Sequence, residues 1–278
     1  MSMRFKNLLV LLVFFAGLAV FAYPFVARAI NTVSTQIAQR EAQTKAEHNA
    51  KKLAAKKKAE NAELAANGLR PSGDVFKATS KTASAKYLNQ HLIGAVAIPS
   101  LDVYVPLYDR TNEVLLQSGA TVLGGTSYPT GGANTHTVIS AHAGLPTKTL
   151  FTNLNKLKVG QRFILTVGTK RLAYQVETID TVLPKDVSKL QIEAGRDLAT
   201  LMTCTPYGVN SHRLLVTGKR VPLKQVTAQT IDDTAKRQWW QAILKIIGAI
   251  LALIVFIILV IRTWRKYRPA PSSQKIHN

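Results

Sequence analysis

Residues 198–221 read LATLMTCTPYGVNSHRLLVTGKRV, and they are the most informative stretch of the chain. Two apolar runs, LATLMTC and RLLVTGKRV, flank the turn sequence TPYG at residues 205–208. Apolar and β-branched runs bounded by Pro and Gly are typical of β-strands joined by loops. The stretch therefore predicts two strands, with Cys204 at the end of the first and Arg213 at the start of the second.

The same pattern of short apolar runs extends back to about residue 93. Leu172, Tyr174 and Val176 alternate with less apolar residues, as a strand with one buried face requires. Five further runs are strand-like: AVAIP at 95–99, VYVPLY at 103–108, THTVISAH at 135–142, QRFILTVG at 161–168 and RLAYQVETI at 171–179.

One helix is expected among these strands, preceded by Pro146 and ended by Gly160. Four apolar residues share one face of it: Leu150, Phe151, Leu154 and Leu157. About seven short strands with one helix predict a mainly β domain, either a closed barrel or a sandwich, of roughly 130 to 140 residues.

Two apolar segments flank this domain. Residues 8–26 follow a basic start and approach the ~20 apolar residues that a membrane-crossing helix needs. We favour an uncleaved anchor within residues 1–30 over a cleaved signal peptide, for which ARA at 27–29 would be the cleavage site. Residues 246–261 carry no charge, and four basic residues follow: Arg262, Arg265, Lys266 and Arg268. The positive-inside rule then predicts a cell-membrane protein with the domain between its two anchors outside the cell.

The chain carries a formal net charge of +21, from 36 Lys and Arg against 15 Asp and Glu. Much of this excess lies in the two ends and in residues 31–70, where Ala, Lys, Glu and Gln predict a charged, solvated helical stalk. No basic and aromatic pattern of nucleic-acid binding accompanies it, so we expect membrane lipid or wall polymer as the anionic neighbour, and no nucleic acid.

Cys204 is the single cysteine, which excludes an internal disulfide framework and a multi-cysteine zinc site. The six histidines show no metal-ligand spacing and no acidic cluster suggests calcium, so we expect no metal and no cofactor. A strand-end thiol beside a Pro–Gly loop is a candidate nucleophile. The alternative is a buried structural cysteine.

A reactive thiol needs a base or a cationic neighbour. If residues 203–205 and 213–215 are neighbouring strands, Arg213 lies beside Cys204 and could stabilise a thiolate and an oxyanion. His142 also ends an apolar strand beside a Gly–Pro loop, which indicates a site at one rim of the domain. His136, at the start of its strand, and His212, within the loop, are weaker candidates.

Two blocks of sequence carry a resemblance to a known family. Residues 200–220, TLMTCTPYGVNSHRLLVTGKR, resemble the signature of class C sortases, the pilin polymerases of Gram-positive bacteria. SAHAGLP at 140–146, followed by LFTNL at 150–154, resembles their histidine block. The similarity spans about residues 93–221. It implies an eight-stranded sortase β-barrel in which His142, Cys204 and Arg213 are the catalytic triad.

The same family carries a lid over its active site, usually Asp-Pro-aromatic. Asp74-Val75-Phe76 matches its place, which implies that Asp74 pairs with Arg213 and Phe76 covers Cys204. Valine replaces the usual proline, and an ordinary linker is the alternative. Ala143 stands where many relatives have arginine. A second membrane helix fits class C better than class A.

The expected layout places an anchor at 1–30, the stalk at 31–70, a lid region at 71–92 and the catalytic barrel at 93–222. A linker at 223–240, a transmembrane helix at 241–262 and a basic cytoplasmic tail at 263–278 follow. The resemblance implies a cysteine transpeptidase that cleaves an LPxTG-like sorting signal between Thr and Gly through a thioester. The acceptor would be a lysine amine of another pilin subunit, so pilins are the expected partners.

Three alternatives stay open. A wall-anchoring sortase would use a peptidoglycan amine instead of a pilin lysine. A non-catalytic, membrane-tethered barrel would bind cell-wall partners and leave Cys204 inert. A hydrolytic cysteine peptidase would release free acid without transfer to an amine.

Overall fold

Residues 198–221 form a long pair of antiparallel strands. We describe the protein from a computed structural model that covers residues 3–72, 75–76, 83–223 and 225–266. Strand β7 (Asp197–Thr205) pairs with β8 (His212–Val221) along its whole length. In this register Cys204 lies directly opposite Arg213, which confirms the two predicted neighbouring strands.

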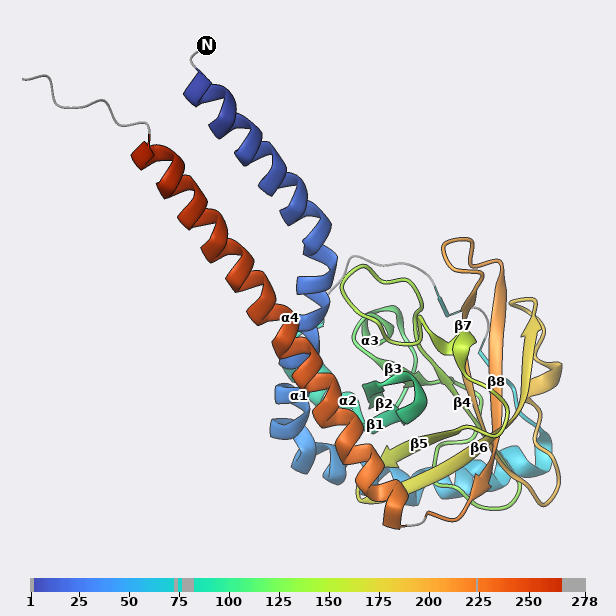
Figure 1. Cartoon of the computed structure of the whole chain (residues 1–278). Helices are drawn as coiled ribbons and strands as arrows, with labels where there is room; N and C mark the ends of the chain where they lie inside the picture. The colour runs from blue at the N-terminus through green and yellow to red at the C-terminus, as the bar shows by residue number, and fades with distance from the viewer. Residues whose placement is uncertain (1–2, 73–74, 77–82, 224, 267–278) are drawn as a thin grey trace, which may run out of the picture.

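Eight strands close into a barrel in the order β1-β2-β3-β4-β7-β8-β6-β5 (Figure 1). The pairs β2–β3 and β4–β7 are parallel and the others antiparallel. The barrel confirms the predicted fold class and decides for a barrel over a sandwich. The remaining strands are β1 (Leu92–Ile98), β2 (Val103–Tyr108), β3 (Ala120–Val122), β4 (Thr135–Ser140), β5 (Arg162–Val167) and β6 (Lys170–Val182).

The barrel interior is filled by apolar side chains from every wall. Leu172, Tyr174 and Val176 of β6 are buried in it, as their alternation predicted. The ring of Tyr174 stacks on Phe163 of β5 with centroids 5.5 Å apart, and its hydroxyl donates to Asp197 Oδ1 at 2.9 Å. The core is therefore continuous from wall to wall, which makes the barrel a rigid support for residues at its rim.

The helix predicted between residues 150 and 157 is wrong. The chain there makes tight turns with one short 3-10 element, η2 (Leu154–Lys156). Leu150 has a left-handed φ of 38°, and the Phe151 amide donates to the His142 carbonyl instead of to a helical partner. All four apolar residues of the predicted face are nevertheless buried, because consecutive tight turns can direct them into the barrel as a helix would.

Four further short helical elements lie before or between the strands in the described residues. Helices α2 (Ala85–His91) and α3 (Glu113–Leu116) each start at a residue whose side chain accepts a backbone hydrogen bond, Ser84 and Asn112 respectively. Two further 3-10 turns are η1 (Pro99–Leu101) and η3 (Ser188–Leu190).

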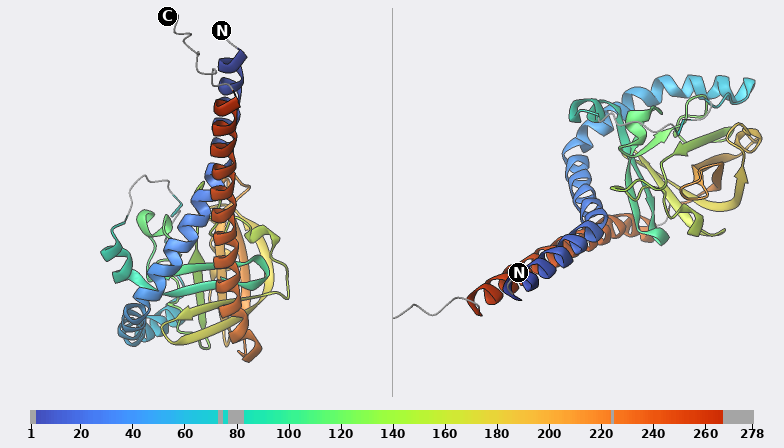
Figure 2. Two further views of the ribbon diagram at one scale, coloured as in Figure 1. Left: turned by 60° about the vertical axis from the view of Figure 1, so that its left-hand side comes forward. Right: turned by 90° about the horizontal axis from the view of Figure 1, so that it is seen from above.

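Anchor and stalk form one helix, α1 (Met3–Asn67), with Pro24 inside it. Figure 2 shows that α1 first runs beside the C-terminal helix and then bends along the barrel. The stalk is helical as predicted, but it is not solvated on all sides. Ala46 and Ala50 are buried against the barrel, and a Cβ on Gly168 would lie 3.1 Å from Ala50 Cβ. The contact face mixes these alanines with Leu53 and the polar Asn49 and Asn61, so the sequence shows no continuous apolar stripe there.

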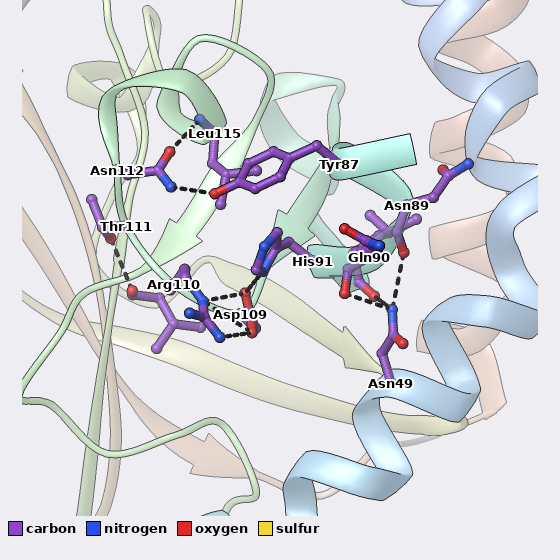
Figure 3. Close-up of polar contacts among 12 residues, drawn as sticks. Asn49, Tyr87, Asn89, Gln90, His91, Asp109, Arg110, Thr111, Asn112 and Leu115 are labelled. Atoms are coloured by element: carbon purple, nitrogen blue, oxygen red, sulfur yellow. Dashed lines mark hydrogen bonds and ion pairs between the residues drawn. The ribbon is translucent and has the colours of Figure 1, made fainter. Parts of the chain in front are cut away.

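A polar network fastens α1 and α2 to the barrel (Figure 3). Asn49 Nδ2 donates to the backbone carbonyls of Asn89, Gln90 and Leu92 at 3.0, 3.1 and 3.1 Å. His91 Nδ1 lies 2.8 Å from Asp109 Oδ1 at the end of β2. Helix α2 is thus held between the stalk and the barrel, so His91 has a structural partner.

The second long helix is α4 (Gln225–Lys266), which runs beside the N-terminal half of α1 (Figures 1 and 2). Most of the stretch expected to be a linker, residues 225–240, is therefore helical. Phe15 and Phe256 lie with ring centroids 4.3 Å apart, and Gln36 Nε2 donates to Gln238 Oε1 at 3.0 Å. Arg237 also forms an ion pair with Asp102 on the barrel.

Both long helices contain a segment long and apolar enough to cross a membrane, Leu9–Ala38 and Asp233–Thr263. The 18-residue apolar stretch that qualifies each segment has no buried residues. This matches the predicted anchors at both ends and suggests membrane anchoring. The tail after residue 266 lies outside the described residues.

Candidate active site

The carboxyl end of β7 and the start of β8 bring Cys204 and Arg213 together. They form a directly opposed pair in the antiparallel ladder, and their exposed fractions are 7% and 5%. Arg213 Nη1 donates to the backbone carbonyls of Asn210 and His212 at 2.9 and 2.8 Å. The loop between the strands thereby orients the guanidinium, and a fixed positive charge lies beside a thiol.

His142 reaches the same rim through a parallel strand. Strand β4 pairs with β7 up to Ser140 and Met202, and the Ala141 amide then donates to the Met202 carbonyl at 3.1 Å. The Thr203 hydroxyl donates to the Ala141 carbonyl at 2.7 Å. Because parallel strands end at the same edge of a sheet, His142 follows β4 at the edge where Cys204 ends β7.

The surroundings of His142 favour its neutral form. The side chain is buried, and desolvation lowers the pKa of His142 below its usual value. Within the described part of the chain, its buried Nε2 atom has no hydrogen-bond partner. A buried ring nitrogen without a partner is uncommon, and here it leaves a position at which a proton can be exchanged.

Phe76 packs across this rim. Its ring centroid lies 5.7 Å from that of His142 in an edge-on arrangement, and Arg213 Cζ lies 5.0 Å from the Phe76 centroid. Phe76 and Val75 also pack against a small apolar cluster that includes Met202. Phe76 therefore covers the side chains of His142 and Arg213. Asp74, the other predicted lid residue, lies outside the described residues.

The two loops that border the rim approach each other closely. Gly144 has a φ of 81°, and a Cβ there would lie 3.1 Å from the ring of Tyr207. Tyr207 itself is 64% exposed. Neither the Gly144–Tyr207 contact nor the hydrogen bond from Thr203 to the Ala141 carbonyl was predicted from the sequence, because no motif marks these residues. Gly144, two residues after His142, was a signal for a tight turn there.

The two weaker histidine candidates differ in where they lie. His136 is buried at the start of β4, where Nδ1 lies 2.7 Å from the Gln191 carbonyl and Nε2 lies 2.7 Å from Thr200 Oγ1. Burial lowers the pKa of His136 as well. His212 begins β8 at the rim, where its carbonyl accepts from Arg213 and its Nδ1 lies 2.9 Å from Ser211 Oγ. His136 therefore has a structural place in the barrel wall.

Among the described residues, no group of three or more His, Cys, Asp or Glu side chains gathers as metal ligands would. The rim itself carries a thiol, an imidazole and a guanidinium group.

Comparison with known proteins gives consistent matches. Residues 96–221 match the protein family described as Sortase domain. A protein named sortase A from Streptococcus agalactiae serotype III (strain NEM316) is 31% identical over 127 residues, which are 45% of this chain and 51% of that protein. The chain thus spans about half the length of this curated relative.

Solved structures of class C sortases match more of the chain. A mutant of sortase C-1 from S. pneumoniae is 37% identical with a TM-score of 0.58, and the match covers 69% of this chain and 98% of that one. Sortase C2 of pilus island 1 from Group B Streptococcus is 43% identical with a TM-score of 0.52, covering 63% and 98%. The matched domain includes the strands that bear Cys204 and Arg213 and the strand that leads to His142, so the chain belongs to the sortase family, with class C sortases as its structural neighbours.

Proposed function

We propose that the chain is a membrane-anchored transpeptidase that cleaves an LPxTG-like sorting signal between Thr and Gly and joins it to a lysine amine of a pilin subunit. One observation carries the proposal: Cys204 and Arg213 are directly paired at the rim where β4 delivers His142. A nucleophile, a proton-transfer group and an oxyanion partner at one edge are what acyl transfer requires.

The reaction starts with proton transfer from the Cys204 thiol to His142 Nε2. The thiolate attacks the Thr carbonyl carbon, and the charge that develops on the carbonyl oxygen is stabilised by the Arg213 guanidinium. Arginine carries five N–H donors in a planar arrangement, and Arg213 Nη1 is held by two backbone carbonyls that fix the plane of the guanidinium. Collapse of the tetrahedral intermediate breaks the Thr–Gly bond, and the His142 imidazolium donates its proton to the leaving glycine amine.

The second half-reaction reverses the roles. A neutral lysine ε-amine attacks the Thr thioester, His142 accepts the amine proton, and the Cys204 sulfur leaves as a thiolate that this proton then neutralises. The product is an isopeptide bond between Thr and lysine. Because one histidine serves both as acid and as base, its pKa must lie near the working pH, and burial under Phe76 favours the neutral, proton-accepting form.

The choice of a pilin lysine over a peptidoglycan amine rests on similarity. The chain is more similar to the two class C sortases than to the sortase A relative, and one of those sortases is named for a pilus island. A C-terminal segment able to cross a membrane, in addition to the N-terminal one, agrees with this choice. The barrel would lie on the outer side of the cell membrane, held by lipid contacts of α1 and α4, where pilin subunits are available.

Intact-mass spectrometry tests the first half-reaction. The full chain in lipid nanodiscs is incubated with an LPxTG peptide, next to Cys204→Ala and Phe76→Ala variants. We expect a thioester adduct on the wild-type chain, more of it on Phe76→Ala, and none on Cys204→Ala. No adduct on either the wild type or the Phe76→Ala variant would contradict the proposal.

Competition between acceptors tests the second half-reaction. The acylated protein receives equal amounts of a pilin domain with an accessible lysine and a peptidoglycan stem peptide with a free amine. We expect the pilin conjugate to dominate. Preference for the stem peptide would indicate wall anchoring, and release of free acid with both acceptors present would indicate a hydrolase.

A further inference from the structure

The loop after His142 is held by the membrane helix α1. Arg28 Nε donates to the Pro146 carbonyl at 3.0 Å, and Asn31 Nδ2 donates to the Thr147 carbonyl at 3.1 Å. Arg28 and Asn31 are three positions apart, so they share one face of α1. Two consecutive carbonyls of the loop therefore receive their donors from a segment more than 110 residues away in the sequence.

The other end of this loop is fixed to the barrel. Lys148 Nζ donates to the Gln117 carbonyl at 2.8 Å, just after α3. The Gly144 amide donates to Thr152 Oγ1 at 3.1 Å, and the Phe151 amide donates to the His142 carbonyl. Only three residues separate His142 from Pro146, so a displacement of the loop at its α1 contacts moves the backbone that carries the imidazole.

The position of α1 explains why these donors matter. Arg28 and Asn31 belong to the segment Leu9–Ala38, which is apolar enough to lie in a membrane. Near lipid, a loop carbonyl has less water to replace a lost partner, so a missing protein donor leaves the loop less well held. The α1 contacts thus tie the loop geometry to the anchored state of the chain.

We propose that Arg28 and Asn31 are positioning residues for His142, through which the N-terminal membrane helix holds the histidine loop in its reactive arrangement. This inference rests on the proposed transpeptidase function for its kinetic consequence. Arg28 and Asn31 touch no reacting atom. They act through the backbone of residues 143–147, and a misplaced imidazole slows proton transfer without weakening the binding of the sorting signal.

Single-turnover kinetics of the full chain in nanodiscs test the inference. The variants are Arg28→Ala, Asn31→Ala and their combination, with Arg28→Lys as the conservative replacement and Ser34→Ala as a matched control on an exposed position of the same helix. We expect the double variant to lower the maximal rate of thioester formation about fivefold to tenfold while half-saturation by the peptide changes less than about twofold. Arg28→Lys should retain the wild-type rate, since an ammonium can donate to the same carbonyl.

Hydrogen exchange provides a readout that does not depend on activity. In the double variant, the amides of residues 144–145 and 147–151 should exchange faster by about fivefold to tenfold, while β7 and β8 keep their wild-type protection. Wild-type exchange in this loop together with a wild-type rate would overturn the inference. An equal loss of rate in Ser34→Ala, or exchange raised throughout the barrel, would also overturn it, because the effect would then be general destabilisation.

The two proposals fail in distinguishable ways. If neither the wild type nor the Phe76→Ala variant forms a thioester, the proposed function is wrong, and the exchange of residues 144–145 and 147–151 still decides whether α1 holds the loop. If the wild type forms the thioester and the double variant matches it in rate and exchange, the function stands and the positioning role is wrong. If the double variant does not fold, Asn31→Asp replaces it, since aspartate keeps the shape of the side chain and removes the donor.

Discussion

Single residues at the rim differ in how firmly they are held. Arg213 is oriented by two loop carbonyls, whereas the Nε2 atom of His142 has no partner within the described residues. Between them, the Thr203 hydroxyl donates to the Ala141 carbonyl and so links the end of β7 to the segment that carries His142. This contrast suits the proposed roles, because an oxyanion partner must be fixed in advance while a proton carrier needs an available nitrogen.

Replacement of Arg213 by Lys tests the fixed partner. An ammonium can still contact the loop carbonyls but cannot present the same planar set of donors to a developing oxyanion. We expect Arg213→Lys to lower the rate of thioester formation about 10²-fold with little change in melting temperature. A variant with the wild-type rate would show that positive charge alone is sufficient at this position.

Removal of the Phe76 ring tests the cover over the site. Phe76→Ala exposes His142 and Arg213 to water, so the pKa of His142 should rise toward its usual value of 6.5 as desolvation is relieved. Alkylation of Cys204 should also become faster. The measurements are NMR titration of the imidazole and the rate of iodoacetamide labelling.

Val75→Ala is the matched control for Phe76→Ala. It removes an apolar contact from the same cluster but leaves the ring over His142 in place. If both variants label Cys204 equally fast, the ring itself does not cover the site, and the lid interpretation of Phe76 is wrong.

Among the elements, the stalk part of α1 was expected to be a solvated helix. It packs against the barrel instead and stabilises it. Ala46 and Ala50 allow close approach, and polar side chains complete the contact. Asn61 is buried and both accepts from the Tyr128 amide and donates to its carbonyl, at 2.8 and 2.9 Å. The stalk is therefore part of the folded domain, which begins well before the first strand.

Loss of the Asn49 side chain tests this view of the stalk. Asn49→Ala removes the donor shared by the carbonyls of Asn89, Gln90 and Leu92. We expect the free energy of unfolding to fall by about 1 to 2 kcal/mol, measured by chemical denaturation of the full chain in detergent. Lys52→Ala, at an exposed position of the same helix, should leave stability unchanged. Equal stability of the two variants would mean that α1 only tethers the barrel.

At the scale of the whole molecule, burial of neutral histidines links stability to pH. The pKa of His136 and of His142 is lowered in the fold by desolvation, while the unfolded chain keeps the usual value of 6.5. Between these values the unfolded state binds more protons, so stability is fully present above pH 6.5 and falls as the pH drops toward the folded-state pKa.

His136 allows this pH dependence to be tested by substitution. His136→Gln supplies a donor and an acceptor without a titrating ring, so the melting temperature should fall less between about pH 7.5 and pH 5.5 than in the wild type. An unchanged slope in His136→Gln would show that His136 does not titrate in this range.

The arrangement of the two long helices completes the whole-molecule view. Segments Leu9–Ala38 and Asp233–Thr263 lie side by side and join the barrel on one side (Figures 1 and 2). Gln36 contacts both Gln238 and the Ala235 carbonyl, and Arg237 contacts Asp102. The barrel is therefore attached to both helices by side-chain contacts, and its rim is held in a defined direction relative to them.

Seven of the eight strands, the two apolar segments and the neighbouring places of Cys204 and Arg213 could be predicted from the sequence, whereas the short strand β3 (Ala120–Val122) could not. The predicted features depend on local signals, namely alternation, turn residues and the length of one loop. The sequence also supplied Phe76 and His142 as candidates, but not the contact between them, because residues far apart in the chain meet only when the barrel closes.

The features that rest on non-local contacts become visible only in the folded chain. The parallel pairing of β4 with β7 places His142 on the rim of Cys204, although more than 60 residues separate them. The turns at 150–157 replaced the predicted helix because Leu150 adopts a left-handed conformation within the packed loop. The stalk contact uses alanines, and Arg28 and Asn31 read as ordinary residues at the end of an apolar segment. Their roles come from the partners that folding brings to them, and such partners leave no periodic trace in the sequence.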